Sequence, residues 1–245
     1  MFKKYSLLGF VLCLVSAFTF ASCATKAIGV RQDASFKKDS IIAGKMAVGG
    51  ITSAKEMSDG EMKSYANILM DQLNDQRKDY SVAPAATVAD KIGTDAHKSM
   101  LTEYAEKGVL GGENIKKLKG ADGIRYIVFA RVDVDTVDKS MKNNSKKGKD
   151  GKVVSPSITA TVSRKISVSY NIYDTGRGIS AWSGSMETKK SESRQHSADS
   201  GLSTAINVAK SVSSGSDKVT YPDTPSLKSL LAKNFKGFAK QMPKK

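Results

Sequence analysis

The chain has two histidines, and neither has the neighbours that histidine chemistry requires. His97 falls in a segment of helical periodicity and His196 in a serine-rich stretch, and no carboxylate or second histidine stands at the spacing of a metal site. Serine is so frequent that a triad completed by a distant serine has no support. We predict no catalytic residues and expect a protein that is not an enzyme. A hydrolase is an alternative for which no acid and base pair can be named.

Two other stretches contain residue types that bind ligands elsewhere. "GVLGGENIKK" (108–117) has three glycines near a helix start, but it lacks the Gly-Lys-Ser/Thr of a phosphate loop and follows no strand. Asp133 and Asp135 are expected on one strand face, where they could bind a hard cation, but no third oxygen donor or sharp glycine turn follows. Solvent-facing strand polarity explains the two aspartates, so we predict no cofactor and no metal site.

The two cysteines, Cys13 and Cys23, lie in an amino-terminal stretch with the layout of a secretory signal. A short basic head with Lys3 and Lys4 precedes "LLGFVLCLVSAFTFA", which has no charge. A membrane span needs about 20 apolar residues, and this run is shorter. We therefore predict a cleaved signal peptide at residues 1–22. Cys13 leaves with it, so the mature chain has no cysteine pair for a disulfide and no thiol set for zinc.

The end of this stretch resembles the lipobox of bacterial lipoproteins, an aliphatic residue and two small residues before a cysteine. Here it is Phe20-Ala21-Ser22-Cys23, with Phe20 in place of the usual leucine. The resemblance implies that Cys23 becomes the first mature residue and carries diacylglycerol and an amide-linked acyl chain such as palmitate. More than one acyl chain gives stable anchoring. The alternative is an ordinary signal peptide with an incidental cysteine.

The same resemblance bears on location in the bacterial cell envelope. In Gram-negative sorting, an aspartate after the lipidated cysteine retains the protein in the inner membrane, and here Ala24 follows. This implies the outer membrane, facing the periplasm, in preference to the inner membrane. Exposure on the cell surface is an open alternative.

The charge of the chain indicates which partners to expect. The formal net charge is +15, and loss of Lys3 and Lys4 with the leader reduces it to +13. An exported protein meets little nucleic acid, so we expect none as a partner. Anionic phospholipid, an acidic cell-wall polymer or an envelope protein partner are the expected counterparts.

Periodicity divides the mature chain into a tether and one domain. Residues 23–40 show no sustained period and are expected to be the lipidated amino terminus and a tether, which could reach about 50 Å at about 3.3 Å per residue. Residues 41–245 are expected to form a single α/β domain. A polar, serine-rich loop at about 190–222 interrupts it and contains a weak helical period at 202–209.

Helices are marked by caps and by apolar residues at steps of three and four. Ser58 and Glu61 form a capping box, Thr94 is the expected cap of a second helix, and Thr224 precedes Pro225 at the start of the last one. The expected helices cover about 58–73, 94–107, 111–120 and 224–242.

Strands are indicated most clearly in the second half. "IRYIVFARVDVDTV" (124–137) begins apolar on both parities, which is typical of a central strand. "SITATVSRKISVSYNIYD" (157–174) alternates over about 50 Å, and only Arg164 breaks its apolar parity. "DTGRG" then turns the chain into "ISAWSGSMETK" (179–189). These three strands are expected to form an antiparallel meander, after shorter strands within 41–51 and 80–85.

The order of elements predicts an α/β (α+β) domain. We expect a mixed sheet with crossover helices in its first half, a long three-strand meander, and a carboxy-terminal helix packed on the sheet.

Several motifs together resemble a group of envelope proteins: the curli-secretion lipoprotein, the lipoprotein activator of penicillin-binding proteins, and the amino-terminal domain of the Tol translocation protein. The motifs are Gly120-Ala121-Asp122 before an apolar strand, Tyr173-Asp174 before a turn, and Trp182-Ser183-Gly184 on the returning strand. The likeness spans about residues 40–190 and the final helix. Trp182 is expected to be a core residue.

The resemblance implies a membrane-anchored, noncatalytic envelope protein. Its expected role is to bind or regulate another envelope component, in cell-wall synthesis or in secretion and assembly. The alternative is a subunit of an oligomeric outer-membrane secretion pore of the curli-secretion type. A strand of about 10 alternating residues would suffice to cross the membrane, and Arg164 interrupts the apolar parity that such a strand needs.

Overall fold

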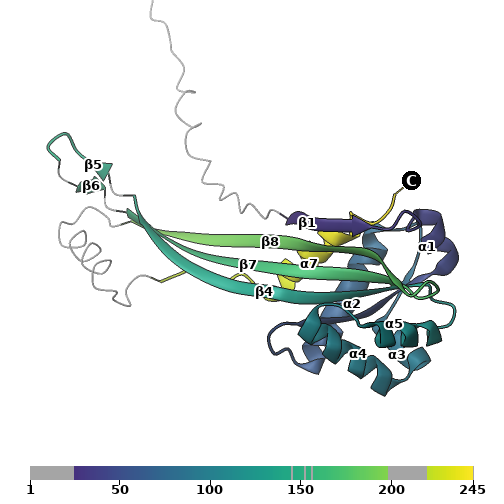
Figure 1. Cartoon of the computed structure of the whole chain (residues 1–245). Coiled ribbons are helices and arrows are strands. Elements are labelled where there is room, and N and C mark those ends of the chain that lie inside the picture. The colour runs from purple at the N-terminus through teal and green to yellow at the C-terminus, as the bar shows by residue number, and fades with distance from the viewer. Residues whose placement is uncertain (1–24, 145, 152, 156, 198–219, 245) are drawn as a thin grey trace, which may run out of the picture.

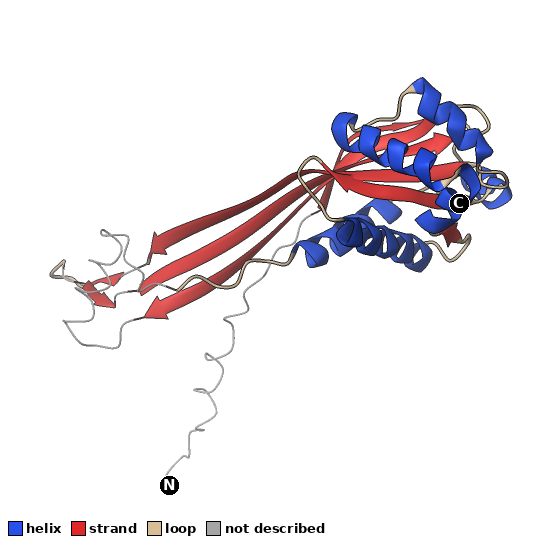
Figure 2. Ribbon diagram, turned by 90° about the horizontal axis from the view of Figure 1, so that it is seen from below, coloured by secondary structure: helices blue, strands red, loops and turns tan. Residues whose placement is uncertain are grey.

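A mixed sheet of six strands, in the order β1-β8-β7-β4-β2-β3, forms the centre of the protein (Figure 1). The computed structural model describes residues 25–144, 146–151, 153–155, 157–197 and 220–244. The predicted signal peptide, Cys23 and the helical period at 202–209 lie outside these residues. Helices cover both faces at one end of the sheet, and strands project beyond them at the other end (Figure 2).

The strands of the sheet are β1 (Thr25–Gln32), β2 (Met46–Ser53), β3 (Val82–Ala83), β4 (Tyr126–Asn143), β7 (Ser157–Asp174) and β8 (Ile179–Ser197). A separate small hairpin consists of β5 (Lys146–Lys147) and β6 (Val153–Ser155). β2 pairs in parallel with β3 and β4, and the other pairings in the sheet are antiparallel. The predicted mixed sheet and its three-strand meander are thereby confirmed.

The helices are α1 (Lys38–Gly44), α2 (Asp59–Gln76), α3 (Ala85–Ile92), α4 (Thr94–Lys107), α5 (Gly112–Lys117), the 3₁₀ turn η1 (Leu118–Gly120), and α7 (Leu227–Ala239). The predicted capping box is present, because Ser58 and Glu61 each bind the main chain of the other. No helix in the described part of the chain is long and apolar enough to span a bilayer.

Two hydrophobic cores lie on opposite faces of the sheet. Under α2 and α7, Tyr170 stacks on Phe238 with ring centroids 3.9 Å apart, and Trp182 meets Phe238 edge-on at 5.2 Å. Under α3, α4 and α5, the rings of Phe129 and Tyr173 are 6.0 Å apart. Trp182 is 1% exposed, which confirms it as a core residue.

A buried amide joins α7 to the meander. The Tyr170 hydroxyl donates to Asn234 Oδ1 at 2.5 Å, and Asn234 Nδ2 donates to the Met186 carbonyl at 2.7 Å and to Thr188 Oγ1 at 3.0 Å. Gly237 allows the close approach, since a Cβ there would lie 2.6 Å from Thr25 Cγ2. The carboxy-terminal helix is therefore fixed against β7, β8 and β1, as the sequence predicts in outline.

Beyond the helices, β4, β7 and β8 continue as an arm, which we define as residues 136–143, 157–165 and 189–197 (Figures 1 and 2). Its nine β7 residues span about 30 Å. Residues 220–226 run along one face, where His196 Nε2 donates to the Thr220 carbonyl at 2.9 Å. The opposite face has rows of hydroxyl groups, including a 2.7 Å hydrogen bond between Ser163 and Ser191.

The tether expected at residues 23–40 is wrong for most of that range. Residues 25–32 form β1, which pairs antiparallel with β8 from Thr25 opposite Thr188 to Gln32 opposite Trp182, and α1 begins at Lys38. Ala27 is the β1 residue that packs on the core. β1 is held at the edge of the sheet mainly by its main-chain hydrogen bonds to β8. Its sequence therefore shows almost no hydrophobic alternation, and periodicity did not predict it as a strand.

Other expected boundaries also shift. β8 continues to Ser197, so the loop expected from about 190 is wrong over 190–197. α3 lies where no helix was expected, directly after Pro84. The cap of α4 is Gly93 in place of Thr94, and that of α7 is Ser226 in place of Thr224.

The extension of β8 to Ser197 has a simple reason. Main-chain pairing does not require an apolar side chain, so a paired strand can continue beyond the apolar residues that identify it in the sequence.

Substitution of a core residue of β7 tests the assignment of its buried face. Val168 is fully buried under α2 and α7, so Val168→Asp places an unpaired carboxylate in the core. We expect a loss of about 3 to 5 kcal/mol of unfolding free energy, measured by urea denaturation of the purified protein. Thr136→Asp, on the exposed face of β4 opposite Lys165, is the control and should change stability by less than about 0.5 kcal/mol. Equal stability of the two variants would contradict the assignment.

Candidate functional site

Both histidines have structural partners. His97 Nε2 donates to the Gly49 carbonyl of β2 at 2.6 Å, and His196 binds the Thr220 carbonyl on the arm. In the described part of the chain, no group of three or more His, Cys, Asp or Glu residues is placed to hold a metal ion. Cys23, the predicted lipid attachment site, lies outside the described residues.

The expectation that Asp133 and Asp135 share a strand face is wrong. A β-bulge between Val132 and Val134 shifts the register of β4 against β7. Such a bulge reverses the side-chain alternation that follows it. Asp135 therefore lies with Arg164, whose Nε and Nη2 donate to its two carboxylate oxygens at 2.7 and 2.5 Å. Asp133 lies 3.3 Å from Arg131 on the α4 side, where burial raises its pKa.

A groove of about 790 Å³ opens between α2 and α4, above the carboxyl end of β2. In open α/β sheets, the carboxyl ends of strands are where ligands commonly bind. One wall is the face of α2 with Met62 and Ala66, and the other is the face of α4 with Leu101 and Ala105. The two alanines have small side chains, which keep the groove wide. Because all four of these side chains are apolar, the walls of the groove are apolar.

The floor of the groove is an unpaired strand edge. β4 pairs with β2 as far as Ser53. On its other side β2 pairs with β3 only at Met46 and Ala47. Pro84 then ends β3, because proline has no N–H to donate to a ladder. Among the described strands, none pairs with the outer edge of β2 over residues 48–53.

The main chain of β2 faces this groove directly. Gly50 lines it and has no side chain. Its φ of +152° favours glycine, and a Cβ there would lie 2.5 Å from Leu101 Cδ2. Thr52, two residues further along β2, also lines the groove and is 1% exposed. In the described structure its hydroxyl group has no hydrogen-bond partner. A buried polar group of this kind normally has a partner.

The neighbouring edge of the sheet is closed in a different way. The Asn74 side chain of α2 binds both main-chain groups of Val82 in β3: Val82 N donates to Asn74 Oδ1 at 2.8 Å, and Asn74 Nδ2 donates to the Val82 carbonyl at 3.1 Å. This amide takes the position of a neighbouring strand, a recognised way of protecting an edge. The outer edge is therefore closed at β3 and open at β2.

The rim of the groove has balanced charge. Its lysines and carboxylates are Lys55, Lys63, Lys98, Glu56, Asp59 and Glu106. A ligand with a strong charge of either sign thus gains little from this rim.

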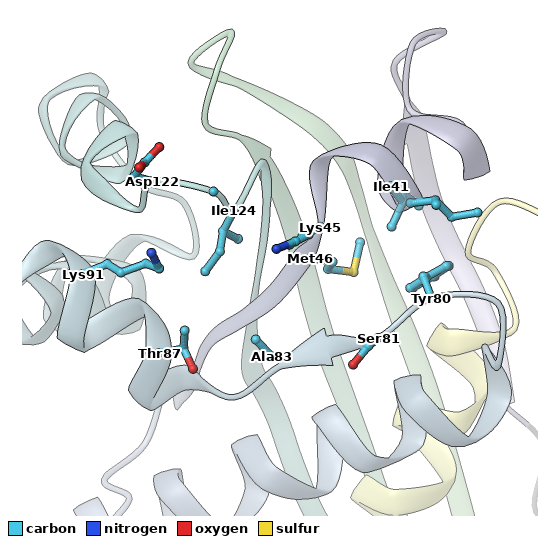
Figure 3. Close-up of a pocket in the computed structure, with 12 residues that line it drawn as sticks. Ile41, Lys45, Met46, Tyr80, Ser81, Ala83, Thr87, Lys91, Asp122 and Ile124 are labelled. Atoms are coloured by element: carbon cyan, nitrogen blue, oxygen red, sulfur yellow. The ribbon is translucent and has the colours of Figure 1, made fainter.

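A second hollow of about 420 Å³ lies at the other end of β2, near the start of β3 (Figure 3). Ile124 lies between Lys45 and Lys91 there, and Tyr80 borders the other side. Lys45 has a φ of +56°, which is unusual for a residue with a side chain, and burial raises the pKa of Tyr80 to about 12. Both lysines are exposed, so this hollow has a basic rim.

Comparison with known proteins finds distant likeness only. No protein-family model matches the chain, and no curated protein matches it. Among solved structures, a dodecamer of a PelC variant from Paraburkholderia phytofirmans is 17% identical, over 87% of this chain and 96% of that one, with a TM-score of 0.35. The PelC dodecamer in another crystal form is 19% identical over the same shares, with a TM-score of 0.30. Lipoprotein GNA1162 from Neisseria meningitidis is 15% identical, over 69% and 95%, with a TM-score of 0.34. Likeness at this level does not define a family.

A carboxylate fixes the α4 wall of the groove to the next helix. Glu103 of α4 accepts from Gly111 N at 3.0 Å, from Asn114 Nδ2 at 2.7 Å and from Lys107 Nζ at 3.0 Å. The hydrogen bonds from Gly111 and Asn114, with that of Lys107, lower the pKa of Glu103 from 4.5 to about 2.

This lowered pKa predicts a pH dependence of stability. The folded state favours ionised Glu103, so its contribution is complete above pH 4.5 and is lost as the pH falls towards 2. We expect Glu103→Gln to be less stable than the natural protein at pH 7 and to lose less stability between pH 5 and pH 2, measured by urea denaturation across this range. Glu106→Gln on the same helix is the control. If Glu103→Gln and the natural protein have parallel pH profiles, the predicted pKa shift is wrong.

Proposed function

We propose that the protein is a noncatalytic lipoprotein of the bacterial cell envelope that binds or regulates another envelope component. The lipobox at Cys23 supports the anchor. The observation that carries the proposal is how soon after Cys23 the chain joins the sheet. Thr25, two residues after Cys23, is already paired with Thr188 in the sheet.

This pairing determines how an anchored domain would stand on the membrane. Two residues span at most about 7 Å, so acyl chains on Cys23 would hold the β1–β8 edge of the sheet close to the bilayer, without the long tether expected from sequence. Lys26 of β1 is exposed beside this point, and Arg31 is exposed towards the other end of the strand. They would face anionic head groups, which attract basic residues near the surface.

An anchor beside β1 would also place the groove on the side of the domain away from the anchor. β1 and the β2–β3 pair lie at opposite edges of the sheet. Four strand spacings of about 4.8 Å separate β1 from β2, or about 19 Å. The membrane would therefore lie along one edge, and the groove at the other would be free for a partner protein.

The arm bears on the alternative role as a pore subunit. Its length of about 30 Å would cross the hydrocarbon core, but a spanning strand set needs one apolar face. Lys139, Arg164, Lys190, Glu192 and Arg194 all lie on the face of the arm that also bears its apolar residues. Each lysine or arginine would cost up to about 2 to 4 kcal/mol at the midplane of a lipid-facing surface. The register of the arm thus favours the binding role over the pore.

The native mass of the lipidated protein distinguishes the two roles. We expect a monomer or a dimer when the protein is extracted in detergent and the detergent contribution is subtracted, because the arm has no lipid-facing surface. A closed ring of many subunits would contradict this expectation and would favour the secretion pore.

Substitution of the predicted anchor tests the envelope assignment. We expect Cys23→Ser to move the protein from the membrane fraction to the soluble envelope fraction, detected by fractionation and by loss of labelled palmitate. Cys13→Ser, within the predicted leader, is the matched control and should leave both unchanged. A Cys23→Ser protein that stays membrane-bound would refute the lipid anchor.

A further inference from the structure

We propose that the groove between α2 and α4 binds an extended segment of a partner protein, which adds as a strand to the open edge of β2. This deepens the proposed function, on which it rests only in taking the partner to be a protein. Strand addition uses main-chain hydrogen bonds for affinity and side-chain pockets for specificity.

The first support is that the edge is open only inside the groove. Asn74 closes the edge of β3 at Val82, and β2 beyond Ala47 has no outer strand partner among the described residues. An open strand edge normally attracts unwanted pairing, and folds protect such edges by covering or charging them. Here the edge is recessed between two helices, and Gly50, Ile51 and Thr52 are buried in it with Leu101 of α4 beside Gly50. A single extended chain would reach the edge once the Leu101 side chain moves aside.

The second support is the direction of the polar groups on this edge. His97 donates to the Gly49 carbonyl from the α4 side, so a side chain already takes an acceptor of this part of β2. From Gly50 onwards the main chain itself lines the groove, and the partnerless hydroxyl of Thr52 lies there as well. An added strand would supply donors and acceptors to an edge that no described strand pairs.

The walls define the chemistry of the segment. Successive side chains of a strand point to opposite sides, here towards Met62 and Ala66 of α2 or towards Leu101 and Ala105 of α4. Because both walls are apolar, the segment should be apolar or small at consecutive positions, as in strands buried on both faces. The open stretch Gly50–Ser53 suits about four residues, and the balanced rim suits a segment of low net charge.

The proposal is tested with capped hexapeptides on the full-length, lipidated protein in detergent. The probe set has cores of Val, Ile, Ala and Thr between terminal lysine and glutamate. Each peptide is paired with a control whose alternate core amides are N-methylated, so that side chains are kept and main-chain donors are lost. We expect at least one peptide to slow hydrogen exchange of the Gly50–Ser53 amides at least tenfold, and its N-methylated form to bind at least tenfold more weakly.

Matched variants locate the binding to the groove. Ala105→Trp, on the α4 wall, should abolish peptide binding, whereas Ala96→Trp, on the same helix outside the groove, should leave it unchanged. Ala86→Trp is exposed on the lining and repeats the test if Ala105→Trp does not fold, as judged by circular dichroism.

Three results would overturn the proposal. They are the failure of every peptide to slow exchange at Gly50–Ser53, equal binding of the N-methylated controls, and protection of these amides that disappears on dilution without peptide. The last would show that a second copy of the chain occupies the groove. The Cys23→Ser protein should bind the same peptides equally well, so loss of the anchor and loss of the strand site are separate outcomes.

Discussion

The pairing of β7 along its whole length with β4 on one side and β8 on the other, with one bulge in each partner, is the constraint on which the other elements depend. β7 is paired along its whole length, from Ser157 opposite Ser197 to Asp174 opposite Ile179, and its alternation determines what each face of the sheet can accept. On one face it presents the buried row that α7 covers, with Tyr170 bonded to Asn234. On the other it presents polar side chains to α4 and then to solvent. The helices occupy only the part of the sheet where both faces offer burial, and beyond them the meander continues as an arm.

An ion pair between Arg164 and Asp135 lies where the core ends and the arm begins. Arg164 occupies an apolar position of β7, where an unpaired cation would be costly. The bulge in β4 turns Asp135 to the same face, and the two groups meet in a bidentate pair. One register shift thus supplies the counter-ion for Arg164, which breaks the apolar pattern of β7 in the sequence.

Elements with a strong side-chain pattern could be predicted from sequence, and those held by the main chain could not. The meander, α2 with its capping box and the apolar stripe of α7 follow from periodicity, and together they define the α/β class. β1 was missed because only Ala27 packs on the core. The shared face of Asp133 and Asp135 was wrong because no local signal marks a bulge. Cys23 stays a prediction, made because a lipobox is local in sequence, and it lies outside the described residues. The groove could not, since it combines residues from Gly50 to Glu106 whose contact depends on where β3 ends.

The two edges of the sheet provide the link between fold and function. A six-stranded open sheet has two edges to protect, and this one closes β3 with Asn74 and recesses the open stretch of β2 between helices. The opposite edge is β1, whose exposed Lys26 and Arg31 would suit a position against head groups if Cys23 is lipidated as we propose. If protection alone had shaped the outer edge, β3 would need only a few more residues to cover β2 as far as Ser53. Pro84 stops it instead, and the glycine at position 50 leaves room for Leu101 of α4 where a further strand residue would lie. This stretch of edge has no described strand partner and lies at the side of the sheet away from the proposed anchor, and it is there that we propose another chain to bind.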